Sequence, residues 1–203
     1  AIKETYTDPN DVTQAYAIGK AYDGGQFAEL NCQAYGALYQ DVLTVPGATL
    51  NWSLAHAGRD GTDTMALLIA PVGVAQDITG ALKNKTTRAA IQEALNGSIT
   101  VNGVNVPIRN YIVDGNISDG CTAWGVHNGT YTVPAGQYVS RFFFVAVTSA
   151  SGDSEEGLKR GNLIDRVWFS TDPVPPAAGS GILRVTKTLL KTDGTALTDA
   201  ELI

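Results

Sequence analysis

Short apolar runs with an alternating pattern dominate the front of the chain. In residues 49–56, Leu50, Trp52, Leu54 and His56 fall on one face at period two. This alternation is typical of a strand that buries one face in a core. Three similar apolar runs lie around it, at residues 27–31, 37–45 and 64–70. Glycine and proline pairs separate these runs, so we predict antiparallel strands joined by turns.

The second half of the chain repeats the pattern. We predict further strands at residues 129–133, 138–148 and 162–170. Residues 138–148 are apolar on both faces, which indicates a central strand covered on two sides. In the last strand, Leu163, Val167 and Phe169 are expected to share a face with Asp165. About eight short strands with turns between them favour a two-sheet sandwich or jelly roll.

The stretch from about residue 72 to 120 has a different character. Residues 77–82 and 87–95 have helical composition, and Gly97 lies where a glycine often ends a helix. Asn102-Gly103 between two apolar triplets predicts a hairpin, because both residues accept the positive φ of a type I′ turn. We therefore predict an all-β, jelly-roll β-sandwich with a helix-plus-hairpin insertion. The insertion is either a lid over an apolar end or one wall of a ligand site.

The end of the chain indicates a domain boundary. Residues 1–171 are predicted to form the β-sandwich module, and residues 172–181 are a linker rich in proline, then glycine and serine. Residues 182–203 contain one alternating strand and an Asp-Gly turn, too little to bury a core of their own. We expect them to be the start of a second domain, ordered by adding a strand to an exposed sheet edge.

Composition and charge narrow the class of partner. The chain has 203 residues, 22 glycines and a formal net charge of −6. This charge, with no basic stretch, argues against nucleic acid or an anionic membrane as a partner. No apolar run approaches the roughly 18 residues that a membrane span needs. We therefore expect neither nucleic-acid binding nor membrane insertion.

Cysteines and histidines give little direct evidence of chemistry. Cys32 and Cys121 either form one disulfide in an exported protein or are two buried small residues. Zinc is not expected, because the two histidines and two cysteines are far apart in the sequence and none shows ligand spacing.

Several motifs carry a resemblance to a known family. They are Phe27-Ala28-Glu29-Leu30-Asn31, Tyr39-Gln40-Asp41-Val42, Pro46-Gly47, His56-Ala57-Gly58-Arg59 and Asn162-Leu163-Ile164-Asp165. In this order they resemble the jelly-roll, galactose-binding-like ectodomains of Gram-positive cell-surface adhesins. The resemblance covers about residues 22–70 and 129–170. It implies a secreted, cell-wall-anchored adhesion module that binds a glycan or another host ligand, and it allows a structural Ca²⁺ ion; no other cofactor is implied.

The tail resembles another family. Residues 185–188 and 191–202 are similar to the opening of a collagen-adhesin B-type or pilin-type immunoglobulin-like repeat. The resemblance implies that Lys187 or Lys191 is one half of an isopeptide bond whose partner strand lies outside this sequence. It also implies further immunoglobulin-like repeats as neighbours in the same protein. The alternative for either lysine is a solvated charge on an edge strand.

The densest polar run, next to a strand end, supplies candidate ligand-binding residues. Arginine and aspartate offer planar donors and acceptors, and a sugar site sets such groups beside an aromatic face. The candidates are His56, Arg59, Asp60, Asp63, Tyr39 and Trp124. The structural alternative is that His56 caps the core and that Arg59 forms an internal ion pair with Asp60 or Asp63.

Metal and catalytic hypotheses complete the prediction. Asp23, Glu29, Asn162 and Asp165 offer the hard oxygen ligands that Ca²⁺ prefers. Asp63 and Asp165 are the carboxylates from which a glycoside hydrolase would be built. No nucleophile elbow, phosphate loop or Cys/His signature occurs, so we expect no enzyme. Two functions remain open: a non-catalytic glycan-binding module, or a structural stalk or tip-scaffold domain without a small ligand.

Overall fold

The computed structural model describes residues 18–32 and 34–171. The sandwich module expected at residues 1–171 is therefore described except for residues 1–17 and 33. The linker, the expected edge-pairing tail, Lys187 and Lys191 lie outside the described residues.

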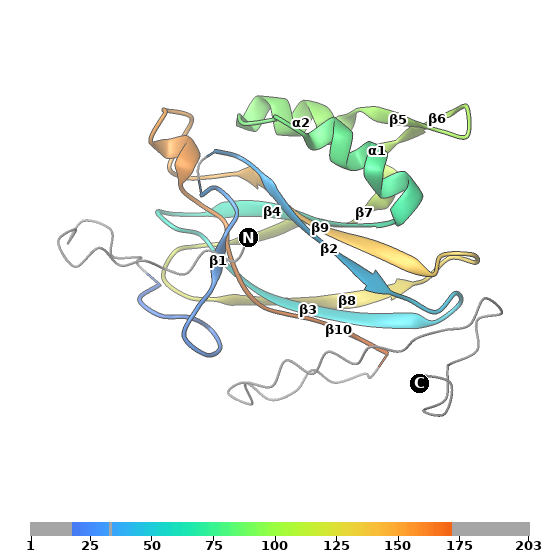
Figure 1. Cartoon of the computed structure of the whole chain (residues 1–203). Coiled ribbons are helices and arrows are strands. Elements are labelled where there is room, and N and C mark those ends of the chain that lie inside the picture. The colour runs from blue at the N-terminus through green and yellow to red at the C-terminus, as the bar shows by residue number, and fades with distance from the viewer. Residues whose placement is uncertain (1–17, 33, 172–203) are drawn as a thin grey trace, which may run out of the picture.

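Two antiparallel four-stranded sheets face each other (Figure 1). The first sheet has the order β1 (Ala28–Glu29), β10 (Leu163–Ser170), β3 (Thr49–Ala57) and β8 (Gly125–Thr132). The second sheet has the order β2 (Ala37–Leu43), β9 (Val139–Thr148), β4 (Asp63–Pro71) and β7 (Ile112–Asp119).

The pairing of these strands is nested. Strand β4 pairs with β7, β3 with β8, β2 with β9 and β1 with β10, so the chain is one long hairpin wound over two sheets. The pair β10–β3 completes the first sheet, and the pair β9–β4 completes the second. This winding is the jelly roll, and it confirms the predicted fold class.

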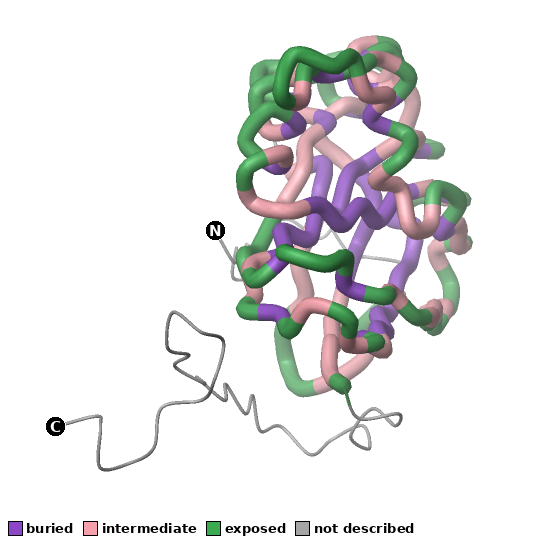
Figure 2. The backbone as a smooth tube through the Cα atoms, turned by 90° about the vertical axis from the view of Figure 1, so that its right-hand side faces the viewer, coloured by how far each residue is buried: buried purple, intermediate pink, exposed green. Residues whose placement is uncertain are grey.

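The core lies between the sheets, where both contribute alternate side chains. Leu50, Trp52, Leu54 and His56 of β3 are all buried, as their alternation predicts. The Phe169 ring of β10 lies 3.9 Å from the Phe142 ring of β9 across the interface, between ring centroids. In Figure 2 the buried backbone accordingly runs through the middle of the molecule.

The insertion between β4 and β7 covers the outer face of the second sheet (Figure 1). It comprises α1 (Val72–Leu82), α2 (Arg88–Asn96), β5 (Ser98–Val101), β6 (Val104–Pro107) and the 3-10 turn η1 (Ile108–Tyr111). The Thr87 hydroxyl caps α2 by accepting from Ala90 N at 3.3 Å. Asn102 and Gly103 have φ of 50° and 80°, as the predicted type I′ turn requires. Ile78 and Ile91 are fully buried, so the insertion extends the core as a lid.

Several details differ from the sequence-based expectation. Strand β8 begins at Gly125 rather than at residue 129, and α1 begins at Val72 rather than at residue 77. The insertion ends at Tyr111 rather than near 120, because residues 112–119 form strand β7 of the second sheet. A bulge between Asp165 and Trp168, with Arg166 at φ 44°, adds one residue to β10. Since each extra residue reverses the alternation, Asp165 and Phe169 do not share a face as expected. A second short 3-10 turn, η2 (Gly157–Lys159), lies in the loop before β10.

The described helices are all too short or too polar to cross a membrane.

Candidate functional site

Asp63, at the start of β4, ties three loops together at one end of the sandwich. Its carboxylate accepts hydrogen bonds from the backbone N–H groups of Arg59 (2.9 Å), Ala150 (2.8 Å) and Asn162 (2.8 Å). The side chain is completely buried. A Cβ on Gly161 would come within 2.9 Å of the same carboxylate, and its φ of 135° also favours glycine. Asp63 therefore has a structural role that leaves it no contact with solvent.

Arg59 lies at the same end of the sandwich, which we call the strand-end corner (residues 56–63 with Glu29 and Asn162). Its Nη1 donates to both carboxylate oxygens of Glu29 in β1, at 2.8 and 3.0 Å. Glu29 Oε1 also accepts from the backbone N–H of Gly161 at 2.9 Å. The arginine side chain is only 8% exposed and the glutamate 12%. Arg59 therefore forms an internal ion pair, as the structural alternative expects, but its partner is Glu29 rather than Asp60 or Asp63. Glu29 is one of the calcium candidates predicted from the sequence.

His56 lies between two side chains that come from distant parts of the chain. Its Nε2 lies 3.2 Å from Asn162 Oδ1, and its Nδ1 lies 2.8 Å from Asp119 Oδ2. Asn162 Nδ2 donates to the Thr148 carbonyl at 2.9 Å, which fixes the orientation of the amide because a carbonyl oxygen can only accept. Asn162 Oδ1 is therefore an acceptor, and His56 Nε2 carries a proton.

His127 of β8 completes this group, which the sequence does not predict. Its Nε2 lies 2.7 Å from the same oxygen, Asp119 Oδ2. Burial raises the pKa of Asp119, but the neighbouring imidazoles of His56 and His127 lower it by more, so the net pKa lies below its usual range. Asp119 is therefore an anion at neutral pH. In β8 the half-buried residues Gly125, His127, Gly129 and Tyr131 alternate with exposed ones, but the sequence has no apolar alternation there from which His127 could have been found.

The exposed candidate Tyr39 lies away from this corner, on the outer face of the second sheet. Its ring is opposite Phe143 in the β2–β9 pair, and the residue is 53% exposed. The Arg141 guanidinium lies over the ring, 4.0 Å from its centroid. Arg141 also donates to both oxygens of Asp41, from Nε at 2.6 Å and Nη2 at 2.8 Å. Tyr39, Asp41 and Arg141 are named here the Tyr39 platform.

Helix α1 holds the Tyr39 platform from the other side. Arg141 Nη1 donates to the Thr79 hydroxyl of α1 at 3.0 Å, so one guanidinium joins β9, β2 and the insertion. The hydrogen bonds from Arg141 lower the pKa of Asp41, and those with Asp41 raise the pKa of Arg141. The platform is therefore an ion pair beneath an aromatic ring, with the insertion beside it.

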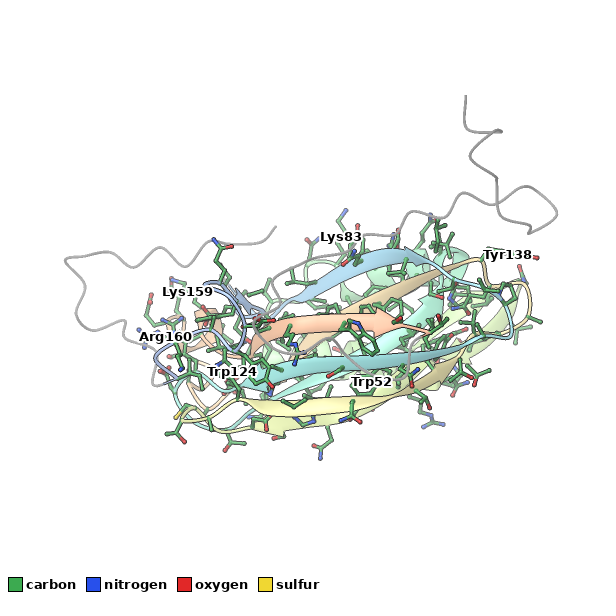
Figure 3. The ribbon with its side chains drawn as sticks, turned by 90° about the horizontal axis from the view of Figure 1, so that it is seen from below. Trp52, Lys83, Trp124, Tyr138, Lys159 and Arg160 are labelled. Carbon is green, nitrogen blue, oxygen red and sulfur yellow. The ribbon has the colours of Figure 1, made fainter. Side chains whose placement is uncertain are left out.

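Trp124 and Asp60 have other surroundings. The Trp124 indole N–H donates to the Lys20 carbonyl at 3.0 Å, and its ring contacts Tyr22 and Phe27 edge-on, so it anchors the segment before β1. Figure 3 places Trp124 at the opposite end of the sandwich from Tyr138. Asp60 is exposed at the strand-end corner and accepts from the Ser151 hydroxyl at 2.6 Å. The six ligand candidates therefore do not form one site.

Each of the four calcium candidates has a protein partner. Asp165 accepts from the backbone N–H groups of Tyr22 and Asp23, at 2.8 and 3.0 Å. Asp23 also lies 3.7 Å from Arg166, between Oδ2 and Nε. Glu29 pairs with Arg59, and Asn162 with His56, as described above. A calcium ion at these residues stays a prediction.

The described residues contain one group whose ligand atoms converge as a metal site requires: His56, Asp119 and His127, all within 4.8 Å of one another. The two histidines, far apart in the sequence, therefore lie close together in the fold. The two cysteines are free thiols, each half-buried. The hydrolase candidates Asp63 and Asp165 both serve as acceptors for backbone N–H groups.

No protein-family model and no curated protein matches the chain. Solved structures that it is similar to include a CBM4 carbohydrate-binding protein, at 12% identity and a TM-score of 0.36, covering 66% of this chain and 59% of that one. A family 16 carbohydrate-binding module matches at 12% identity and a TM-score of 0.38, covering 75% of this chain and 82% of that one. The enzymatically active domain of tailspike protein 4 of bacteriophage CBA120 matches at 11% identity and a TM-score of 0.31, covering 66% and 13%. The chain spans about 59% of the length of the CBM4 chain it matches.

Proposed function

We propose that this chain is a non-catalytic, extracellular adhesion module, displayed on a cell wall, that binds carbohydrate at the Tyr39 platform. The observation that carries the proposal is the state of the Tyr39 ring. One face lies against the Arg141 guanidinium, while the residue as a whole is 53% exposed. A held aromatic ring with an open face is a surface on which a sugar ring stacks, since the C–H groups on one face of the sugar are apolar and pack against the aromatic ring.

The ion pair beside the ring supplies the polar part of such a site. The Asp41 side chain is 40% exposed, so its oxygens remain accessible to sugar hydroxyls although both accept from Arg141. Arg141 is itself fixed by three hydrogen bonds, to Asp41 and to Thr79. The platform is therefore held in place before a ligand arrives, which reduces the entropic cost of binding.

A glycan array tests the proposal with three forms of the full chain. Wild type is expected to bind at least one class of glycan, and Tyr39→Ala to reduce its affinity by about tenfold or more, which corresponds to roughly 1.4 kcal/mol. Tyr138→Ala is the matched control, because Tyr138 is equally exposed (53%) but precedes β9, outside the Tyr39 platform. No binding by wild type, or equal loss in both variants, would contradict the proposal.

A second function is favoured by the state of the strand-end corner. His56, Arg59 and Asp63 are buried and paired with other parts of the protein, so they join elements rather than face a ligand. This arrangement suits a structural stalk or tip-scaffold domain of a surface protein. Binding to no glycan by wild type, together with an unchanged fold in Tyr39→Ala, would favour the scaffold.

A further inference from the structure

We propose that His56, Asp119 and His127 form a binding site for a divalent transition-metal ion, with Zn²⁺ as the ion that fits the donors. The three ligand atoms are His56 Nδ1, Asp119 Oδ2 and His127 Nε2, within 4.8 Å of one another. Two imidazole nitrogens and one carboxylate oxygen are a donor set that zinc accepts, whereas calcium takes oxygen ligands.

The protonation of His56 is the first observation that points to a cation. Because Asn162 Oδ1 accepts from His56 Nε2, a neutral His56 has its free lone pair on Nδ1. That lone pair lies 2.8 Å from Asp119 Oδ2, whose own lone pairs face it. Two lone pairs at this distance repel each other unless a cation lies at them, and the cation is either an added proton or a metal ion.

A third donor converges on the same point. His127 Nε2 also points at Asp119 Oδ2, 2.7 Å away, which gives the group the three protein ligands of a zinc site with one open position. The His56 and His127 rings are edge-to-face with centroids 6.4 Å apart, so both nitrogens reach one point without stacking.

Asn162 orients the imidazole of His56. Histidines that bind metal usually donate their other ring N–H to a carbonyl, an amide oxygen or a carboxylate, which fixes the ring. His56 does so to Asn162 Oδ1, and Asn162 is itself held by the Thr148 carbonyl and by Asn31 Oδ1 at 3.0 Å. His56, fully buried, is thus pre-oriented with Nδ1 toward Asp119.

Gly125 leaves room for the carboxylate. A Cβ at this position would collide with Oδ1 and Cγ of Asp119 and would lie 2.8 Å from its Oδ2, so no larger residue fits against the side chain. Gly125 is opposite His56 in the β3–β8 register, and Leu54 is opposite His127. The three ligands therefore lie on strands of both sheets, β3 and β8 of the first and β7 of the second, rather than on loops.

The site is closed on one side and open on the other. The His56 side chain is fully buried, whereas the side chains of Asp119 and His127 are 18% and 24% exposed. An ion can therefore enter past His127, and water can complete its coordination. Ligand atoms around tetrahedral zinc stand roughly 3.3 Å apart, from bonds of about 2.0 Å, so the distance from Asp119 Oδ2 to each imidazole nitrogen would lengthen by about half an ångström.

Isothermal titration of the chelator-treated full chain with ZnCl₂ tests the site. The titration uses a Cys32→Ser/Cys121→Ser background, because the two free thiols would themselves bind zinc. We expect one ion per chain with a dissociation constant in the micromolar range or lower, no competition from millimolar Ca²⁺, and a melting temperature that rises with zinc. His127→Ala is expected to weaken binding at least tenfold. Asn128→Ala, the exposed neighbour on β8, is the control and is expected to bind as the parent does.

A spectroscopic readout separates the metal from the proton without relying on a variant. In ¹⁵N-imidazole NMR, zinc is expected to shift His56 Nδ1 and His127 Nε2 and to leave His56 Nε2 protonated. If His56 is protonated on both nitrogens and zinc does not displace the proton on Nδ1, the proposal is overturned and the cation at this place is a proton. Binding with more than one ion per chain, or binding that His127→Ala leaves unchanged, would also overturn it. Because this site is separate from the Tyr39 platform, either proposal can fail alone.

Discussion

At the scale of single residues, polar groups at the strand-end corner replace missing backbone pairing. Loops cannot satisfy their backbone N–H groups from a neighbouring strand, so a buried side chain must accept from them. Asp63 does this for three N–H groups at once, and Asp165 does it for Tyr22 and Asp23. One carboxylate can therefore hold several loops in place.

Asp63→Asn is expected to destabilise the protein by about 3 kcal/mol. The amide keeps the size of the side chain, but its NH₂ group faces backbone donors, so at least one buried N–H loses its acceptor. Chemical denaturation followed by tryptophan fluorescence measures the change. Asp60→Asn, at an exposed position in the same loop, is the control and should change the free energy of unfolding by no more than about 0.5 kcal/mol. Equal effects in the two variants would mean that burial of the carboxylate does not determine the loss in free energy of unfolding.

The same corner explains what sequence reasoning could not find at residue scale. His56 is predicted on the core face because the alternation Leu50, Trp52, Leu54 is local. Its contacts are not local: Asp119 is 63 residues away and Asn162 is 106 residues away. The contact with Asn162 depends on the register of β3 with β10, and the contact with Asp119 depends on the packing of β7, in the other sheet, against β3; no short pattern encodes either. The metal site could therefore not be derived from ligand spacing.

At the scale of elements, strands with a clear apolar pattern were predictable, even where they carry a bulge, and a strand without such a pattern was not. β2, β3, β4 and β9 fall within two residues of their predicted ranges, because apolar alternation or a fully apolar run marks them. β7 escapes prediction, since its sequence IVDGNISD lacks clean alternation. It is an edge strand with two register shifts against β4, and such shifts interrupt the period of two. The predicted insertion was too long for this reason.

The Asp41–Arg141 ion pair, which helps to attach the insertion to the sandwich, makes the stability of the protein depend on pH. The pKa of Asp41 is lowered in the folded protein by its hydrogen bonds with Arg141, which also reaches α1 through Thr79. A lowered pKa contributes stability that is fully present above the unfolded pKa, about 3.9, and is lost as the pH falls through the folded pKa. Below about pH 4, wild type should therefore lose more stability per pH unit than Asp41→Asn does.

Urea denaturation of both proteins between pH 2 and pH 7 measures this difference. Asp41 is partly exposed, so solvent screening keeps the effect small, and high salt should reduce it further. The Asp41→Asn curve isolates this carboxylate from others that titrate in the same range, such as Asp119. Parallel curves below pH 4 would show that the Asp41–Arg141 pair contributes nothing to folding.

At the scale of the whole molecule, the nested pairing sets how stability is distributed. β4 and β9 lie inside the second sheet, with the core on one face and the insertion on the other, and nearly all their residues are buried. β1 has two residues at a sheet edge, and the β5–β6 hairpin pairs with no other strand among residues 18–32 and 34–171. Edges and isolated hairpins open locally, whereas a strand covered on both faces opens only when the sandwich unfolds.

Native-state hydrogen exchange is therefore expected to rank these elements. Amides of β4 and β9 should exchange most slowly, with an opening free energy equal to the global value from denaturation, whereas amides of the β5–β6 hairpin should exchange several orders of magnitude faster. Zinc, if it binds at His56, Asp119 and His127, should slow exchange in β8 and at the end of β7, because these edge strands carry two of its ligands. Hairpin amides protected as strongly as those of β9 would mean that the insertion and the sandwich unfold as one unit, and that α1 and α2 are part of the core rather than a lid on it.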